Sequence, residues 1–294
     1  MKAPRVKRAA DPRVSDLIAR MATIISSVAH QPDGVADARE ILAYLLDVQR
    51  SWPAFNGDAT VSPELFSRAL MAAEKRAHGA PIQYCAGLAA FRKLTLAVDR
   101  RVLIPRPETE LLVEHVLSRV NTGIAFDICT GSGAIALALA TEGNFQSVTA
   151  TDISADAIEV AQSNRDRYAE SLTAPVEFLE GSALAPLGDR GANVIVSNPP
   201  YIAFSELFTL DESVRDWEPS VALLAGDNGM AVIADIVSGA PRNLLDGGLL
   251  ALEVDTRRAV LVAELTAAAG LYRDISILPD LTGRDRFVLA YKAD

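Results

Sequence analysis

The stretch Asp127-Ile128-Cys129-Thr130-Gly131-Ser132-Gly133, followed directly by the alanine-rich run at 134–140, decides the fold of this chain. The apolar residues before the stretch are typical of a buried strand, and the alanine-rich run is typical of a helix. Glycine at such a strand-to-helix turn lets a ligand approach the main chain closely. The turn therefore predicts the first strand and helix of an α/β domain, with a ligand site where the strand ends.

Strand-like and helical segments alternate along the rest of the chain. Strands are predicted at 124–128, 147–151, 176–179, 194–197 and 249–254, with two more near the end of the sequence. Helices are predicted at 108–120, 134–141, 155–168, 229–245 and 258–269. Strands that alternate with helices of about ten to fifteen residues form mostly parallel, doubly wound sheets. We therefore predict an α/β fold for residues 106–294.

The first part of the chain has a different pattern. Apolar residues recur at helical spacing within 14–28 and 38–46, and Ser62-Pro63-Glu64 opens a third helix that runs to about residue 78. From residue 88 to 103, alternating apolar residues predict a two-stranded ribbon that turns near Asp99-Arg100. The predicted organisation is a helical domain at 1–86, a β-hairpin linker at 87–105 and the α/β domain at 106–294.

Composition excludes several classes of protein. Half of the 294 residues are apolar and 22% are charged, unlike a disordered or fibrous chain. The net charge of −10 argues against a protein that binds long nucleic acid by neutralising phosphates. Residues 1–20 are basic and are expected to form a solvated tail, with contact to RNA or a partner as the alternative.

Cysteine content and hydropathy predict the compartment. Only two cysteines occur, Cys85 and Cys129, so neither a disulfide scaffold nor a zinc site is expected. The sequence lacks the apolar block of a signal peptide and any run of about eighteen apolar residues that could span a membrane. A soluble, cytoplasmic, monomeric protein without membrane contact is expected.

Asp152 ends the strand that follows the glycine turn, and a carboxylate there can accept hydrogen bonds from both hydroxyls of a ribose. A dinucleotide site would show G-x-G-x-x-G, whereas Ile135 or Ala136 fills the place of the third glycine and no phosphate-binding lysine follows. The site suits an adenosine with a cationic or zwitterionic tail, which means S-adenosylmethionine. A tight turn with a structural aspartate is the alternative, and Asp127 either contacts the ligand or fixes the loop.

The tetrapeptide Asn198-Pro199-Pro200-Tyr201 directly follows a predicted strand, where open α/β sheets bind their ligands. Its prolines stiffen the loop and leave backbone carbonyls to accept hydrogen bonds, and Asn198 adds a side-chain carbonyl. Two convergent acceptors would hold both hydrogens of a planar –NH2 group and aim its nitrogen lone pair, while Tyr201 offers a ring for stacking. The alternative is a rigid turn with a packed tyrosine. Together with Asp152, the loop predicts methyl transfer to a planar nitrogen, achieved mostly by positioning.

At this point the chain resembles the HemK-type protein-(glutamine amide nitrogen) methyltransferases, which modify peptide-chain release factors. The resemblance covers nearly the whole chain and is carried by the segments AREILAYLL, HGAPIQY, LIPRPETELLVE, DICTGSGAIALALA, SNPPYI, EPSVALLAGDNGM and GRDRFVLA. The Asn-Pro-Pro-Tyr tetrapeptide alone is shared with adenine and guanine methyltransferases. Combined with IPRPETE, it is far more specific.

The resemblance implies a class I S-adenosylmethionine-dependent methyltransferase with a doubly wound sheet, a β-hairpin linker and a small helical domain that helps to recognise the substrate. It implies methylation of the glutamine in a Gly-Gly-Gln motif of a release factor. On the matching positions, cofactor contacts fall on Cys129, Thr130, Gly131, Ser132, Gly133, Asp152 and Asn198. The substrate amide would be held by Asn198, Pro199, Pro200 and Tyr201, with Asn198, Pro199 and Tyr201 as the catalytic residues. Arg106 and Glu108 would shape the site or its entrance.

The chain departs from the family pattern at three places. Cys129 stands where many members have glycine, which preserves backbone contact if the local dihedrals are ordinary, and it is expected to act as a small hydrophobe. At Gly181-Ser182-Ala183 the family has an acidic or polar residue followed by an aromatic beside the adenine; Ser182 can still bond the base, but Ala183 cannot stack on it. Glu253-Val254-Asp255 replaces the commoner Glu-Ile-Gly.

Other substrates remain possible at the level of sequence. A close variant would methylate a glutamine in a ribosomal protein. An enzyme acting on the exocyclic amino group of a DNA or RNA base would profit from a basic groove, which the acidic composition disfavours. The third class, a binding module without turnover, is disfavoured by the intact Asn198-Pro199-Pro200-Tyr201 loop and Asp152. A release factor is thus the expected partner, with no stable nucleic acid complex.

Overall fold

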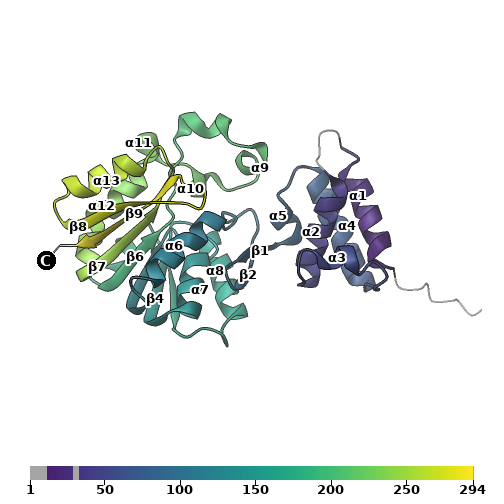
Figure 1. Ribbon diagram of the computed structural model, residues 1–294, viewed down its shortest axis with the longest axis horizontal. Helices are drawn as coiled ribbons and strands as arrows, with labels where there is room; N and C mark the ends of the chain where they lie inside the picture. Colours follow the sequence, from purple (N-terminus) through teal and green to yellow (C-terminus); the bar gives the residue numbers. More distant parts are fainter. Residues whose placement is uncertain (1–11, 29–32, 294) are drawn as a thin grey trace, which may run out of the picture. The chain divides into compact units, whose positions relative to one another are not determined.

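The computed structural model describes residues 12–28 and 33–293. The chain divides into two compact units, residues 1–88 and residues 89–294, called the N-terminal and C-terminal units below (Figure 1). The tail predicted at 1–20 lies outside the described residues as far as residue 11. From Val14 onward the chain is helical, so the prediction of a loose tail is wrong for that part. No helix in the described part of the chain is long and apolar enough to cross a membrane.

The N-terminal unit is built from helices, as predicted. Its elements are α1 (Val14–Ile25), α2 (Gly34–Leu46), α3 (Trp52–Phe55), α4 (Pro63–Ala77) and α5 (Ile82–Ala86). The Ser62 hydroxyl accepts a hydrogen bond from the backbone N–H of Leu65 at 3.1 Å, which confirms the expected cap of α4. α3 and α5 were not predicted, because one turn of helix is too short to show a periodic apolar pattern.

The hairpin consists of β1 (Leu88–Phe91) and β2 (Leu94–Ala97), so it turns at Arg92-Lys93. The predicted turn near Asp99-Arg100 is therefore wrong for the hairpin. Arg92 has a φ of +52°, and its guanidinium bonds Glu142 at 2.6 Å and Glu114 at 3.0 Å. Ion pairs to distant residues, which local sequence does not reveal, hold this turn in place.

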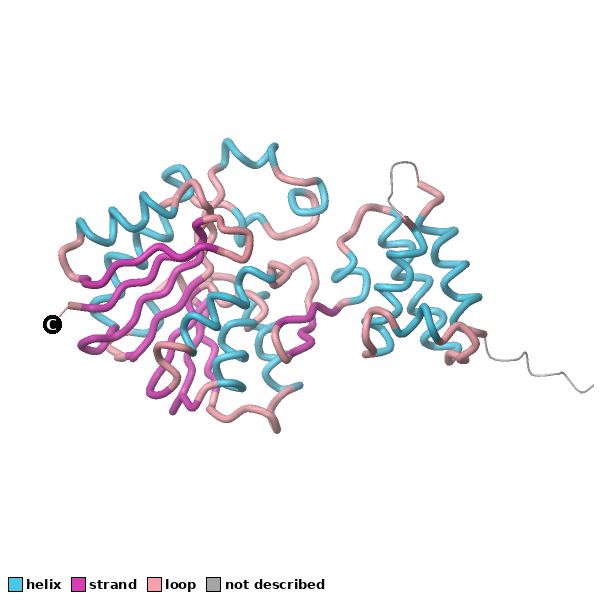
Figure 2. Tube along the Cα trace, viewed as in Figure 1, coloured by secondary structure: helices cyan, strands magenta, loops and turns pink. Residues whose placement is uncertain are grey.

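The strands of the C-terminal unit form a sheet in the order β5-β4-β3-β6-β7-β9-β8. They are β3 (Thr122–Ile128), β4 (Asn144–Asp152), β5 (Val176–Glu180), β6 (Ala192–Ser197), β7 (Leu244–Glu253), β8 (Tyr272–Pro279) and β9 (Asp285–Lys292). These strands lie side by side in one sheet (magenta in Figure 2). β5, β4, β3, β6 and β7 are parallel, whereas β9 pairs antiparallel with β7 and β8. The prediction of a mostly parallel sheet is confirmed.

Helices cover both faces of this sheet. α6 (Pro107–Leu117), α7 (Ala134–Glu142) and α8 (Ala155–Arg167) pack on one face, and α12 (Ala231–Asn243) and α13 (Ala259–Ala268) pack on the other. Side chains that alternate along a strand reach the two cores in turn: Ala125 of β3 lies in the first core and Phe126 in the second. Both residues are almost fully buried, as the near-continuous apolar runs of parallel strands require.

Several predicted boundaries move in the structure. The helix predicted at 229–245 ends at Asn243, whose side-chain N–H groups donate to the carbonyls of Gly188 and Arg190 at 2.9 and 2.8 Å, and β7 begins at the next residue. The helix predicted at 108–120 ends at Leu117. The long connections also contain short helices that periodicity does not reveal: η1 (Ala185–Leu187), η2 (Phe204–Thr209), α9 (Glu212–Arg215), α10 (Ser220–Leu223) and α11 (Gly226–Gly229).

Candidate active site

The loop between β3 and α7 has an unusual backbone. Cys129, Gly131 and Gly133 have φ values of +62°, +55° and +82°. A side chain at Gly131 would meet nothing within 4 Å, so the main chain is open to a ligand there. Gly133 is different, because its Cβ would press on Ala161 and Phe178 at 3.2 Å, which gives this glycine a role in helix packing.

Cys129 does not have the ordinary dihedrals that the sequence analysis made the condition for keeping backbone contact. Its positive φ lies in the left-handed region, which is costly for a residue with a Cβ. Burial raises the pKa of its thiol, and the neighbouring carboxylates of Asp152 and Asp127 add to this effect. The side chain therefore stays a thiol at neutral pH, as expected of a small hydrophobe.

Asp152 ends β4 and ties the loop together. One carboxylate oxygen accepts from the backbone N–H of Gly131 at 2.8 Å, and the other accepts from that of Ser154 at 3.0 Å. The backbone N–H of Ile153 also bonds this carboxyl, and a carboxylate has about four acceptor sites in all. Burial raises the pKa of this carboxyl, while the backbone N–H donors oppose that change. Asp152 therefore orders the loop while keeping acceptor capacity for a ligand.

Asp127 fixes the loop backbone, which was one of the two roles considered for it. It is fully buried, and its Oδ2 accepts from the Thr130 hydroxyl at 2.6 Å and from the backbone N–H of Ala136 at 3.0 Å. Its Oδ1 has no hydrogen-bond partner among the described residues. Burial raises the pKa of Asp127 to about 7. The carboxyl therefore holds Thr130 and the first turn of α7 together from inside the protein.

Asp127→Asn is expected to weaken the pH dependence of stability. Between pH 3.8 and about 7 the folded carboxyl keeps a proton that the unfolded one loses, so stability falls as pH rises through this window. The difference in free energy of unfolding between pH 5 and pH 8 should shrink by about 1–3 kcal/mol in the variant. Urea unfolding at the two pH values measures it. An unchanged difference would mean that Asp127 is ionised throughout.

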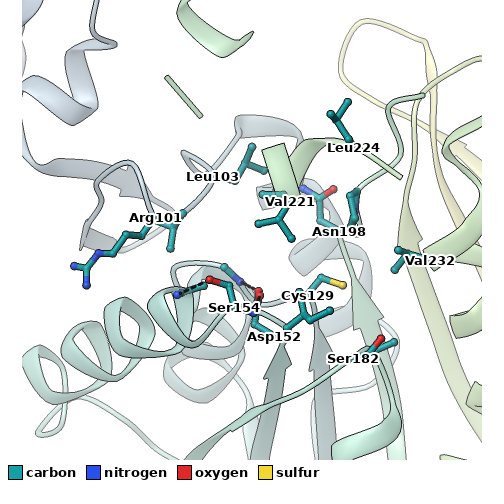
Figure 3. A pocket seen from close by; sticks show the side chains of 17 residues that line it. Arg101, Leu103, Cys129, Asp152, Ser154, Ser182, Asn198, Val221, Leu224 and Val232 are labelled. Carbon is teal, nitrogen blue, oxygen red and sulfur yellow. Dashed lines mark hydrogen bonds between the residues drawn. The ribbon is translucent and has the colours of Figure 1, made fainter. Parts of the chain in front are cut away.

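A cavity opens above the carboxyl ends of β3, β4 and β6. It encloses about 820 Å³ of space including its mouth. Asp152 and Cys129 lie at the strand ends on one side, and Leu103, Val221 and Leu224 lie across the opening from them (Figure 3). Most of the lining is apolar, and its polar side chains include Asp152, Ser154 and Asn198. Such a pocket suits a flat apolar group with a polar end.

A second cavity of about 430 Å³ adjoins the first. It is lined by Pro199, Tyr201 and Arg106. Four residues line both cavities: Leu103, Asn198, Pro200 and Ala222. The Asn-Pro-Pro-Tyr loop therefore stands between two spaces, one on the side of Asp152 and one on the side of Tyr201.

Two arginines hold the segment 214–224, which contributes to the lining of both cavities. Arg106 bonds the buried carboxylate of Glu218 at 2.5 Å, and Arg100 lies over the ring of Trp217 at 4.7 Å while donating to the carbonyl of Asp216 at 2.9 Å. The segment 214–224, which contains α10, is thus attached to the loop before α6. Arg106, predicted to shape the site or its entrance, lines the second cavity and carries one of these attachments.

Two short helical segments after Tyr201, η2 and α11, are held by Arg258 and by a close approach at Gly229. Arg258 bonds Glu206 at 2.7 Å and donates to the Asn228 carbonyl at 2.7 Å. A Cβ at Gly229 would lie 2.1 Å from the Tyr201 carbonyl, so only glycine allows this close approach. These contacts fix the chain that continues from Tyr201.

The predicted site residues are distributed as follows. Cys129, Gly131, Asp152 and Asn198 line the first cavity, and Asn198, Pro199, Pro200 and Tyr201 line the second. Thr130 and Ser132 line a third, smaller cavity together with Asn198. Gly133 and Glu108 line none of the three. The functional roles of these residues stay predictions.

The structure adds residues that sequence reasoning missed. Ile153, Ser154 and Ala157 lie beside Asp152 on the first cavity, and Ser154 caps α8 by accepting from the Ala157 N–H at 3.2 Å. The position of Ser154 directly after the strand was the signal that could have pointed to it. Thr109 was also missed. Its Oγ1 accepts a hydrogen bond from Asn198 Nδ2 at 3.1 Å.

Family models match both parts of the chain. The PrmC N-terminal domain matches residues 22–87, and the methyltransferase small domain matches residues 107–210. A solved structure of a methyltransferase from Pyrococcus furiosus superposes with a TM-score of 0.52 at 19% identity, covering 70% of this chain and 92% of that chain. This likeness shows the methyltransferase fold, and the predicted fold class is confirmed.

Curated relatives match along nearly the whole length. The release factor glutamine methyltransferase of Deinococcus radiodurans is 38% identical over 265 residues, which cover 89% of this chain and 92% of that protein. The release factor glutamine methyltransferase of Moorella thermoacetica is 39% identical over 261 residues, covering 88% and 91%. Since these matches span both units and the Asn-Pro-Pro-Tyr loop, the chain belongs to the release factor glutamine methyltransferase family.

Proposed function

We propose that this chain transfers a methyl group from S-adenosylmethionine to the side-chain amide nitrogen of a glutamine in a peptide-chain release factor, namely the glutamine of its Gly-Gly-Gln motif. The observation that carries the proposal is the pair of adjoining cavities whose common wall contains Asn198 and Pro200. A two-substrate transfer needs such an arrangement, because the donor and the acceptor must reach the same point from two sides. The family of the chain supports the choice of substrate.

The first cavity fits the cofactor. Asp152 would accept from the ribose hydroxyls, since its carboxylate keeps acceptor capacity beyond the backbone N–H groups that bind it. The open backbone at Gly131 would allow close approach of the ligand. Ala183 stands where the family has an aromatic residue beside the adenine. Ile153, Leu224 and Val232 would instead surround the adenine with apolar side chains. When bound, S-adenosylmethionine supplies an electrophilic methyl group carried on a sulfonium.

The second cavity would take the glutamine amide. Asn198 Oδ1 and the Pro199 carbonyl are the two acceptors proposed to hold the –NH2 hydrogens. Holding both hydrogens keeps the nitrogen lone pair pointed toward the first cavity instead of delocalised into the carbonyl. Tyr201 would pack against the flat amide, and because burial raises its pKa to about 12 its hydroxyl stays protonated at neutral pH. Catalysis would rest on this positioning.

The expected result of a transfer assay is methylation of the release factor and of nothing else. The protein is incubated with methyl-labelled S-adenosylmethionine and either a release factor, the same factor with its Gly-Gly-Gln glutamine replaced, or DNA and RNA oligonucleotides. Label should appear on the intact factor and vanish with the glutamine. Label on the oligonucleotides alone would overturn the proposal in favour of a base-amine methyltransferase.

The helical N-terminal domain is proposed to help recognise the release factor. The match of residues 22–87 to the PrmC N-terminal domain supports this role. In the same assay, a short Gly-Gly-Gln peptide should be methylated with a higher KM than the whole factor, because it offers nothing beyond the reacting loop. Equal KM values would argue that recognition is confined to the cavities.

A further inference from the structure

A side-chain amide has two ends of nearly equal size, one that accepts and one that donates hydrogen bonds. A site that uses the oxygen of Asn198 must therefore fix which end faces the substrate. In this structure the Nδ2 end donates to Thr109 Oγ1 at 3.1 Å. Because Nδ2 is bound to Thr109, Oδ1 is the end of the Asn198 amide that can accept a hydrogen bond from a substrate –NH2 group.

The Thr109 hydroxyl is itself held from a third element. It hydrogen-bonds to the carboxyl of Glu253, the last residue of β7. Thr109 is 4% exposed and Glu253 is 1% exposed, so solvent does not compete for these bonds. Burial raises the pKa of Glu253 to about 7. Above that pH its carboxylate only accepts, so the hydroxyl proton of Thr109 goes to Glu253 while an oxygen lone pair faces Asn198.

The position of Thr109 is rigid. It lies in the first turn of α6, which begins at Pro107, and its backbone N–H donates to the Arg106 carbonyl at 3.1 Å. α6 buries Leu112 and Val113 in the core on its face of the sheet. The hydroxyl is therefore carried by a packed helix, which suits it to orient a neighbouring side chain.

We infer that Thr109 is a positioning residue for the methyl transfer: it fixes the Asn198 amide with its oxygen toward the substrate, and Glu253 in turn fixes the Thr109 hydroxyl. The inference rests on the proposed function, since it concerns how Asn198 works there. It goes beyond that function by adding two buried residues of α6 and β7, neither of which lines the two adjoining cavities.

The kinetic test compares side chains of the same shape. Thr109→Val replaces the hydroxyl by a methyl group and should lower kcat by roughly 10- to 100-fold, the usual effect of a misplaced catalytic group. The Kd for S-adenosylmethionine should change far less than kcat, because Thr109 lies outside the first cavity and, although it lines the third cavity beside Thr130 and Ser132, it is only 4% exposed. Thr109→Ser keeps the hydroxyl and should restore most of kcat.

A double-mutant cycle separates positioning from general destabilisation. If Thr109 acts through Asn198, adding Thr109→Val to Asn198→Ala should change kcat little beyond the single Asn198→Ala variant. Additive losses would overturn the inference. Thr109→Ser and Thr109→Ala form a second matched pair that differs by the hydroxyl oxygen alone and adds no atom, so the comparison stands even if the valine variant folds poorly.

A structural measurement decides the inference without any substrate. The side-chain NH2 signals of Asn198 in a ¹⁵N-correlated NMR spectrum are assigned by their loss in Asn198→Ala. They should shift in Thr109→Val or Thr109→Ala and remain near their wild-type positions in Thr109→Ser. Unchanged signals in the variants without a hydroxyl would refute the inference. If wild-type protein methylates no release factor, the proposed function fails, while these spectra still report whether Thr109 holds Asn198.

Discussion

Replacing Asn198 with alanine is expected to lower kcat for release-factor methylation by roughly 100- to 1000-fold, comparable to the loss of one preorganised polar group from an active site. The substitution removes the side-chain acceptor at the wall between the two cavities and leaves the loop backbone intact. The Kd for S-adenosylmethionine should rise only slightly, because Asp152 and the Gly131 backbone remain. Single-turnover methylation and calorimetric cofactor binding measure the two quantities.

Asn193→Ala is a matched control for this prediction. Asn193 lies on β6, the strand that Asn198 directly follows, and its side chain accepts from the Ile124 N–H at 2.9 Å, away from both cavities. Its loss should cost stability and leave kcat within a few fold of the wild type. If Asn198→Ala instead reduces cofactor affinity as much as turnover, the loop belongs to the cofactor site and its assignment to the substrate amide is wrong.

Replacing Asp152 with alanine should have the opposite profile. The Kd for S-adenosylmethionine is expected to rise roughly 100-fold, because charge-assisted hydrogen bonds to the ribose are lost and Gly131 loses its 2.8 Å tie. At saturating cofactor, kcat should change much less than in Asn198→Ala. Asp152→Asn keeps one acceptor oxygen and should fall between the alanine variant and the wild type.

The control for charge is Glu180→Ala. Glu180 ends β5 directly opposite Asp152 in the sheet register, yet it is exposed and lies outside the cavity. Removing this carboxylate deletes the same charge close to the site without removing a proposed ligand contact. A similar rise in Kd for both variants would indicate a long-range charge effect, and an unchanged Kd in Asp152→Ala would refute the ribose role.

Much of the fold followed from local pattern. Strand and helix order in the C-terminal unit could be predicted because buried parallel strands are apolar and short, while the helices between them are long enough to show their period. The predicted boundaries of elements were wrong where residues distant in sequence determine the position at which the element ends. α12 ends at Asn243 because distant carbonyls of residues 188 and 190 bind its side chain. The hairpin turns at Arg92 because acidic residues of α6 and α7 bind that arginine.

Some residues of the candidate site could likewise be identified from local sequence, and others only from the structure. Asp152 and the residues from Asn198 to Tyr201 stood out because each group directly follows a strand, and the carboxyl ends of parallel strands meet at one edge. Asp127 could not be assigned from sequence, because the choice between ligand contact and loop support depends on burial. Its full burial and its bonds to Thr130 and Ala136 favour support of the loop.

The amino-acid sequence by itself determined the reaction class, because residue type and spacing within single loops specify which groups can bind an adenosine and a planar nitrogen. Only the tertiary structure decided what holds those groups in place. Thr109 and Asn198 are 89 residues apart and meet because α6 packs over the sheet beside β6 and β7. Such a contact depends on sheet order and helix packing, which arise from the whole core and leave no local mark in the sequence.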